Sequence, residues 1–213
     1  MTHVPQGSSV RIGLRELLGG EPDPDFSLVL PPGWVRRGVD EDEQERMLAQ
    51  IRTRTMQAHR PDLHARLRVM VDEAFTQMRK VSTVAMFTAA DEAPESAYLP
   101  ASLTASIQHA EPGQTLDSYV RAAILADGAT PLLGDKRIMR VERETSDTLD
   151  GEQLLVTTVA YLTPVPGSGR RRALLLTLVL LRGADVPADD PPLLQMKALF
   201  DLCASTLTWM PGE

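Results

Sequence analysis

The stretch ALLLTLVLL, Ala173–Leu181, is apolar at every position except Thr177. A strand with one face in water alternates apolar and polar residues, whereas a strand covered on both faces is apolar throughout. The stretch has the length of a strand and is too short to cross a bilayer. It therefore predicts a central strand that is covered on both faces, and it predicts no membrane insertion.

The segments on either side of this strand indicate antiparallel pairing. Leu154–Leu162 is a second apolar strand, and the turn-forming sequence VPGSGRR, Val165–Arg171, joins it to Ala173–Leu181. Lys136–Arg143 precedes both, and it places Met139 and Val141 on one face and mostly charged residues on the other. Strands that are joined by short turns must run antiparallel.

Four further strands are expected in the first half of the chain. The first two flank the turn Pro31-Pro32-Gly33 and are read as partners, and the last two are joined by a polar turn. These strands are Phe26–Leu30, Trp34–Arg37, Val81–Ala89 and Ala97–Gln108.

Helices are predicted in three places. Asp40 can cap a helix that begins with three acidic residues, and Pro61 suits the first position of a second helix. In that second helix an apolar stripe, expected to be core, consists of Leu63, Leu67, Met70, Val71, Ala74, Phe75 and Met78. A short helix is expected over residues 115–126, and Pro191 opens an amphipathic final helix.

This order of elements predicts one α+β domain over residues 26–213, with an antiparallel sheet of six or seven strands and helices on both faces. Residues 1–25 have weak periodicity and a turn-rich end, and are expected to form a loosely ordered lead-in.

Composition excludes several classes of partner. A net charge of −7 disfavours binding to nucleic acid, and the basic cluster Arg170-Arg171-Arg172 is expected to be a solvated hairpin tip. The single cysteine, Cys203, rules out an internal disulfide and favours a reducing compartment. The first residues do not have the pattern of a secretory signal, so we expect a cytoplasmic protein.

The familiar catalytic and metal-binding patterns do not fit. The sequence GSG at 167–169 lies between strands, and TPLLGDKR at 130–137 leads into a strand instead of the helix that a phosphate loop requires. His59 and His64 are five residues apart with a proline between them, which suits surface positions better than metal ligands. Cys203 lies on the apolar stripe of the final helix and is expected to be inert. We therefore predict no catalytic residues, no cofactor and no metal.

Five residues are candidates for a ligand or partner surface. Trp34 follows Pro-Pro-Gly and fits either a core position or a binding surface. Arg36, Arg37, Arg137 and Arg140 lie on strands and could receive an anionic ligand, although charged residues on the solvent side of half-buried strands are the ordinary alternative.

Three phrases carry a family resemblance: FSLVLPPGWVRR at 26–37, YLTPVPGSGRRRALLLTL at 161–178 and LFDLCASTLTW at 199–209. Together they resemble an uncharacterised actinobacterial family and, more distantly, the fold shared by the photosystem subunit PsbP and the nuclear import factor Mog. The resemblance implies an antiparallel sheet between helices that is used for binding proteins. The predicted helical pair is longer than in that pattern.

The leading hypothesis is thus a non-catalytic protein–protein interaction or accessory module, linked to a secretion or envelope system. A domain that binds a small anionic ligand is the alternative, followed by an enzyme whose site is assembled only in space. A homodimer is also expected.

Overall fold

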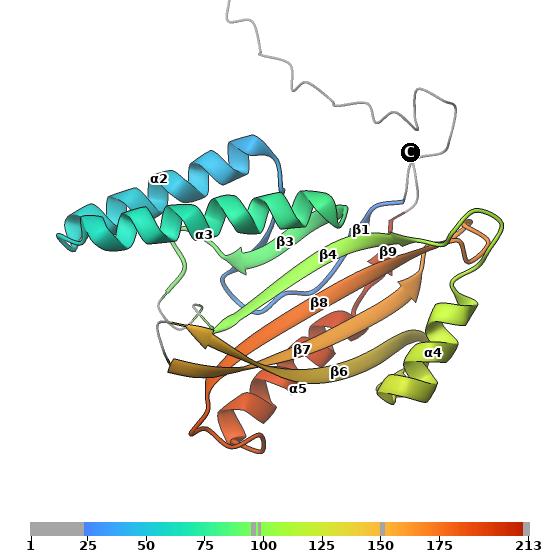
Figure 1. The fold of residues 1–213 in the computed structure, drawn as a ribbon. Helices are drawn as coiled ribbons and strands as arrows, with labels where there is room; N and C mark the ends of the chain where they lie inside the picture. Colours follow the sequence, from blue (N-terminus) through green and yellow to red (C-terminus); the bar gives the residue numbers. More distant parts are fainter. Residues whose placement is uncertain (1–23, 95–96, 98, 150–151, 211–213) are drawn as a thin grey trace, which may run out of the picture.

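In a computed structural model of the chain, the described residues are 24–94, 97, 99–149 and 152–210. Of the predicted lead-in, only residues 24 and 25 belong to this part. Among the described residues there are four helices, a seven-stranded antiparallel sheet and a two-stranded sheet (Figure 1). The predicted α+β class, with an antiparallel sheet and helices on both faces, is confirmed.

The large sheet has β8 at its centre, as its apolar sequence predicts. From one edge to the other its strands are β2 (Trp34–Arg37), β3 (Thr83–Ala89), β4 (Ala101–His109), β8 (Arg172–Gly183), β7 (Glu152–Pro164), β6 (Asp135–Leu149) and β5 (Thr130–Leu132).

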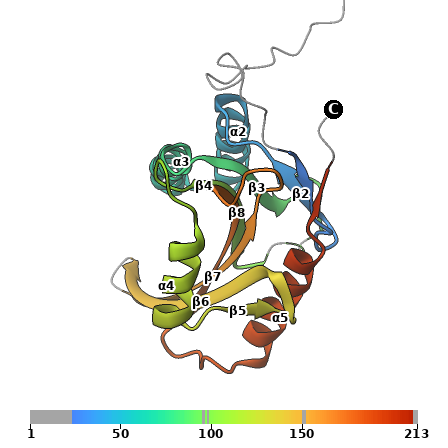
Figure 2. The same ribbon diagram turned by 90° about the vertical axis from the view of Figure 1, so that its right-hand side faces the viewer.

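Helices lie on both sides of this sheet (Figure 2). One side carries α2 (Glu41–Gln57), α3 (Pro61–Lys80) and α4 (Asp117–Asp127), and the other carries α5 (Pro191–Ser205). The local signals placed the helix starts correctly. The Asp40 side chain accepts a hydrogen bond from the Glu43 backbone, while proline opens both α3 and α5.

The core lies on the α5 side of the sheet, which we call the core face. On β8 this face carries Leu174, Leu176, Leu178 and Leu180, all at most 1% exposed. They belong to one apolar cluster with Phe200 of α5. The other side, which on β8 carries Leu175, Thr177, Val179 and Leu181, we call the open face.

The small sheet corrects one predicted pairing. Strands β1 (Phe26–Ser27) and β9 (Thr208–Trp209) pair with each other, so the expected pairing of Phe26–Leu30 with Trp34–Arg37 is wrong. β2 pairs with β3 instead. The Phe26 ring, 3% exposed, packs edge-on against Phe87 and Trp209, and this burial attaches the two ends of the described chain to the core.

The expected core stripe of α3 is only partly buried. Phe75 is 1% exposed, but Met70 is 50% exposed and Ala74 is also exposed. The reason is that α3 packs along α2 and covers the sheet only near β3. In the described residues, no helix is both long and apolar enough to cross a membrane.

Candidate functional site

Trp34 lies in the core and not on a binding surface. It is 7% exposed, its ring packs edge-on against Phe200 with centroids 5.2 Å apart, and its Nε1 donates to the Ala97 carbonyl over 2.8 Å. Of the two positions that the sequence allows for Trp34, the structure has the core one.

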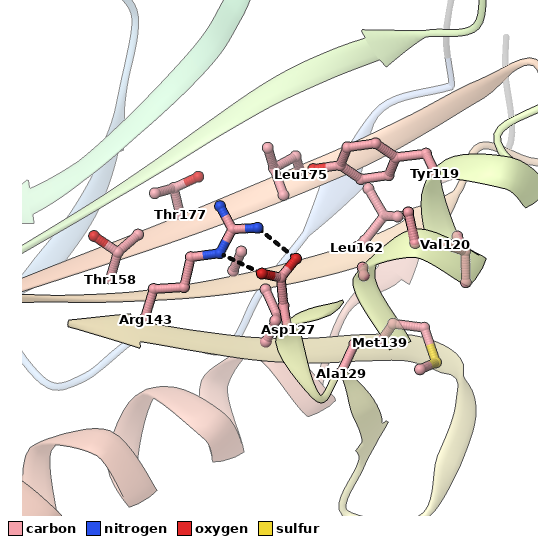
Figure 3. A pocket seen from close by; sticks show the side chains of 14 residues that line it. Tyr119, Val120, Asp127, Ala129, Met139, Arg143, Thr158, Leu162, Leu175 and Thr177 are labelled. Carbon is pink, nitrogen blue, oxygen red and sulfur yellow. Dashed lines mark hydrogen bonds and ion pairs between the residues drawn. The ribbon is translucent and has the colours of Figure 1, made fainter. Parts of the chain in front are cut away.

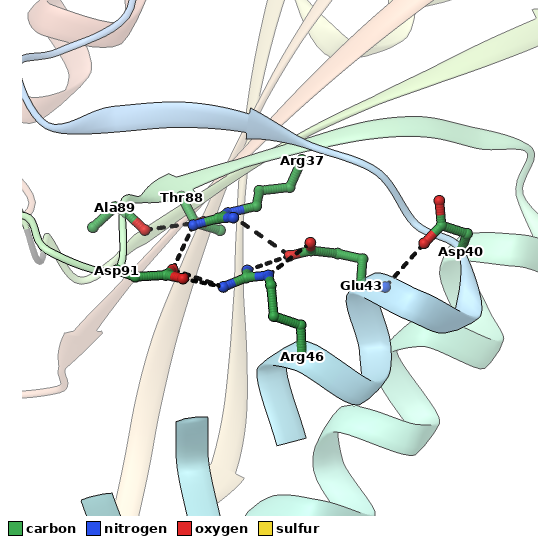
Figure 4. Close-up of polar contacts among 7 residues, drawn as sticks. All are labelled: Arg37, Asp40, Glu43, Arg46, Thr88, Ala89 and Asp91. Atoms are coloured by element: carbon green, nitrogen blue, oxygen red, sulfur yellow. Dashed lines mark hydrogen bonds and ion pairs between the residues drawn. The ribbon is translucent and has the colours of Figure 1, made fainter. Parts of the chain in front are cut away.

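Arg36 and Arg37 lie next to each other on β2 and point to opposite faces. Arg36 is bonded to Asp25 over 2.8 Å and lies 4.5 Å from the centroid of the Phe26 ring. Arg37 joins a cluster of alternating charges on the other side, in which Arg37 and Arg46 both contact Glu43 and Asp91 (Figure 4). This cluster attaches the first turns of α2 to the edge of the sheet.

Arg137 and Arg140 lie on β6, with β3, β4, β8 and β7 between them and β2. Arg137 is bonded to Asp135 over 2.7 Å, and Arg140 to Asp201 and Glu142 over 2.8 and 2.7 Å. The structure therefore does not bring the four candidate arginines together, and each already has a carboxylate partner from its own chain. Binding of an anion at any of them stays a prediction.

A polar network joins α5 to β6 and β7 on the core face. Asp201 accepts from both Arg140 and Tyr161, and Glu142 accepts from Lys197 over 2.6 Å. Burial acts to raise the pKa of Glu142, but the bonds from Lys197 and Arg140 outweigh it and hold that pKa below its ordinary value. Burial and the bond to Asp201 raise the pKa of Tyr161 far above its ordinary value. Tyr161 is 1% exposed, so at this residue the network is buried, and it attaches α5 to the sheet.

The remaining reactive side chains of the described residues do not form a cluster. Cys203 is 5% exposed, and burial raises the pKa of its thiol, in agreement with the expectation of an inert residue. Across the described ranges, no three His, Cys, Asp or Glu side chains lie close enough to share a metal ion.

The open face is the feature that the sequence interpretation missed. On β4, on β8 and on β7 from Leu154 to Leu162, every described side chain that points to this face is uncharged. They are Ser102, Thr104, Ser106 and Gln108 on β4, Leu154, Val156, Thr158, Ala160 and Leu162 on β7, and Ala173, Leu175, Thr177, Val179 and Leu181 on β8.

Helices cover this face only in part. α3 lies along one side of it and α4 along the other (Figures 1 and 2). Leu175, Thr177 and Val179 are half-buried, and Leu181 is 47% exposed. The expectation that β8 is covered on both faces is therefore wrong for the open face.

A cavity of about 370 Å³ lies where the open face meets α4 (Figure 3). Its roof is α4, in which no residue is buried and Tyr119 is 53% exposed. Its floor consists of side chains from β6, β7 and β8. The charged groups at its lining are Arg143 and Asp127, which are bonded to each other.

Comparison with known proteins gives no family. No family model and no curated protein matches the chain. A solved structure from Bacteroides thetaiotaomicron is 10% identical with a TM-score of 0.40, and the match covers 87% of this chain and 45% of that one. LpqN of Mycobacterium tuberculosis, described as involved in cell envelope biogenesis, is 10% identical with a TM-score of 0.44 over 90% of this chain and 87% of LpqN. These scores are too low to carry an argument about function.

Proposed function

We propose that this protein is a non-catalytic interaction module that binds a protein partner on its open face. The observation that carries the proposal is the absence of charged side chains from that face on β4, on β8 and on the described Leu154–Leu162 part of β7, combined with its partial exposure. A sheet face that stays in water normally carries charged and strongly polar residues. This face has apolar and hydroxyl side chains instead, in a chain of which 24% is charged.

Helix α4 beside the face supports the same reading. Tyr119 of α4 is 53% exposed and lines the same cavity as Leu162 and Leu175, so apolar surface continues from the sheet onto α4. A continuous exposed apolar patch on a folded protein marks an interaction site, because leaving it in water is unfavourable. A partner segment that lies across β8 between α3 and α4 would bury side chains such as Leu181 and Val179.

Site-specific photo-crosslinking in the native organism tests the proposal. A photoreactive residue replaces Leu181 on the open face or, as the control, Gln153, which is exposed on the opposite face of β7. We expect a discrete crosslinked protein from position 181 and none from position 153. The substitution Leu181→Arg, combined with crosslinking from Val179, should abolish the product, whereas Gln153→Arg should leave it unchanged.

Equal crosslinking from both faces, or a product that survives Leu181→Arg, would refute the open face as the binding surface. The identity of the crosslinked protein also tests two expectations from the sequence, which stay predictions. An envelope or secretion component would support the predicted pathway, and a second copy of this chain would support the predicted homodimer.

A further inference from the structure

The cavity under α4 is polarised from end to end. One end is apolar and is lined by Tyr119 and Val120 of α4 with Leu162 and Leu175 of the sheet (Figure 3). The other end holds the Arg143–Asp127 pair and the side chains of Thr158 and Thr177. A site with one apolar and one hydrogen-bonding end matches a molecule that is divided in the same way.

Hydrogen-bonding capacity remains at the polar end. Arg143 donates to Asp127 through Nε, over 3.1 Å, and through Nη2. The Arg143 Nη1 makes no hydrogen bond to Asp127. The hydroxyls of Thr158 and Thr177, which also line the cavity, are not bonded to another described residue. A guanidinium nitrogen and two hydroxyls are therefore available to an acceptor atom without breaking the ion pair.

The charge of the polar end selects the type of head group. Arg143 and Asp127 cancel, and the cavity has no other charged side chain in its lining. An ionised carboxylate loses hydration on entering a largely apolar cavity, and the only cation there, Arg143, is already compensated by Asp127. A carbonyl or hydroxyl oxygen accepts the same hydrogen bonds at a smaller cost of desolvation, so an uncharged head is favoured.

The volume limits the size of the ligand. At roughly 30 Å³ for each water-sized group, a cavity of about 370 Å³ holds on the order of a dozen non-hydrogen atoms. This corresponds to a short hydrocarbon chain with one small head group.

We propose that the cavity under α4 binds a small amphiphile that has an uncharged, hydrogen-bond-accepting head and a short hydrocarbon tail. The head lies at Arg143, Thr158 and Thr177, and the tail lies against Val120, Leu162 and Leu175. This goes beyond the proposed protein partner and does not depend on it, because the cavity occupies only the α4 end of the open face.

The test is a methyl NMR titration of the full chain with two probes that have the same tail, decanamide and decanoate, at about pH 7, where the carboxylate is ionised. We expect decanamide to shift the methyl signals of Val120, Met139, Leu162 and Leu175 and to bind at least about tenfold more tightly than decanoate. Asp127→Asn removes the carboxylate that compensates Arg143, leaves a net positive charge at the polar end, and should reverse the preference in favour of decanoate.

A matched pair of variants tests the location. Ala160→Phe places a ring in the cavity and should abolish binding, whereas Ala126→Phe, at an exposed position of α4 outside the lining, should not change it. If Ala160→Phe does not fold, the reversal of the preference by Asp127→Asn still tests whether the ligand binds at the polar end of the cavity. No shift with either probe at millimolar concentration, tighter binding of decanoate to the wild type, or shifts away from the cavity would each overturn the proposal. None of these outcomes affects crosslinking from position 181, so the two proposals fail separately.

Discussion

Asp201 should be one of the most sensitive positions in the molecule, because one of its oxygens accepts from a buried tyrosine and a partly buried arginine. Its Oδ1 accepts from the Tyr161 hydroxyl over 2.7 Å and from Nε of Arg140 over 2.8 Å. Tyr161 lies on β7 and Arg140 on β6, so the single carboxylate of Asp201 connects α5 to two strands. We expect Asp201→Ala to destabilise the fold well beyond the average effect of a surface substitution.

The magnitude follows from what the substitution leaves unpaired. The Tyr161 hydroxyl is almost completely buried, and leaving such a donor without an acceptor costs about 1–3 kcal/mol. Arg140 keeps Glu142 as a partner, and its side chain is 20% exposed, so its loss is smaller, about 0–1 kcal/mol. The free energy of unfolding should therefore fall by about 1–4 kcal/mol.

Urea unfolding at neutral pH measures this loss, and a double-mutant cycle assigns it. Tyr161→Phe removes the hydroxyl without leaving an unpaired donor and should cost about 1 kcal/mol. In the Tyr161→Phe background, Asp201→Ala should cost at least about 1 kcal/mol less than in the wild type, with an unchanged m-value. A loss below about 1 kcal/mol for Asp201→Ala, or additive effects of the two substitutions, would refute this account of how α5 is fastened.

Three other predictions concern single side chains. The pKa of Glu142 is lower in the fold than its ordinary value of 4.5. Its ion pairs therefore stabilise the protein above pH 4.5 and lose their effect as the pH falls through the lowered pKa. The urea midpoints of the wild type and Glu142→Gln should accordingly converge on acidification. Trp34→Phe should lower the free energy of unfolding by about 1–3 kcal/mol through loss of the bond to the Ala97 carbonyl, measured by urea titration; a change near zero contradicts the buried position. Cys203 should react with a thiol reagent at least about a hundredfold faster in denaturant than in the native protein, since burial both shields it and raises its pKa; equal rates contradict this.

Elements that are specified by their own residues were predictable. The capping side chain of Asp40 and the prolines at 61 and 191 act within one turn of helix, so they locate α2, α3 and α5 without knowledge of the rest of the fold. The same holds for the β7–β8 hairpin, in which Pro164 pairs with Ala173 across the predicted turn.

Elements that depend on distant partners were not predictable in this way. β1 and β9 have two residues each, which is too short to show any periodicity, and they lie at opposite ends of the described chain. The candidate arginines failed as a cluster for the same reason, because strand order separates β2 from β6 and spacing along the sequence does not contain that order.

The open face explains why an apolar run was misread. A continuous apolar strand indicates that both faces are meant to leave water, and β8 follows that rule in its sequence. Within the described chain only the core face is fully covered, by α5 and the β1–β9 pair. The sequence of β8 is therefore consistent with a cover that the described part of the chain supplies only in part. The proposed partner would provide the remaining cover. Binding therefore explains an uncharged face with Leu181 at 47% exposure better than folding alone does.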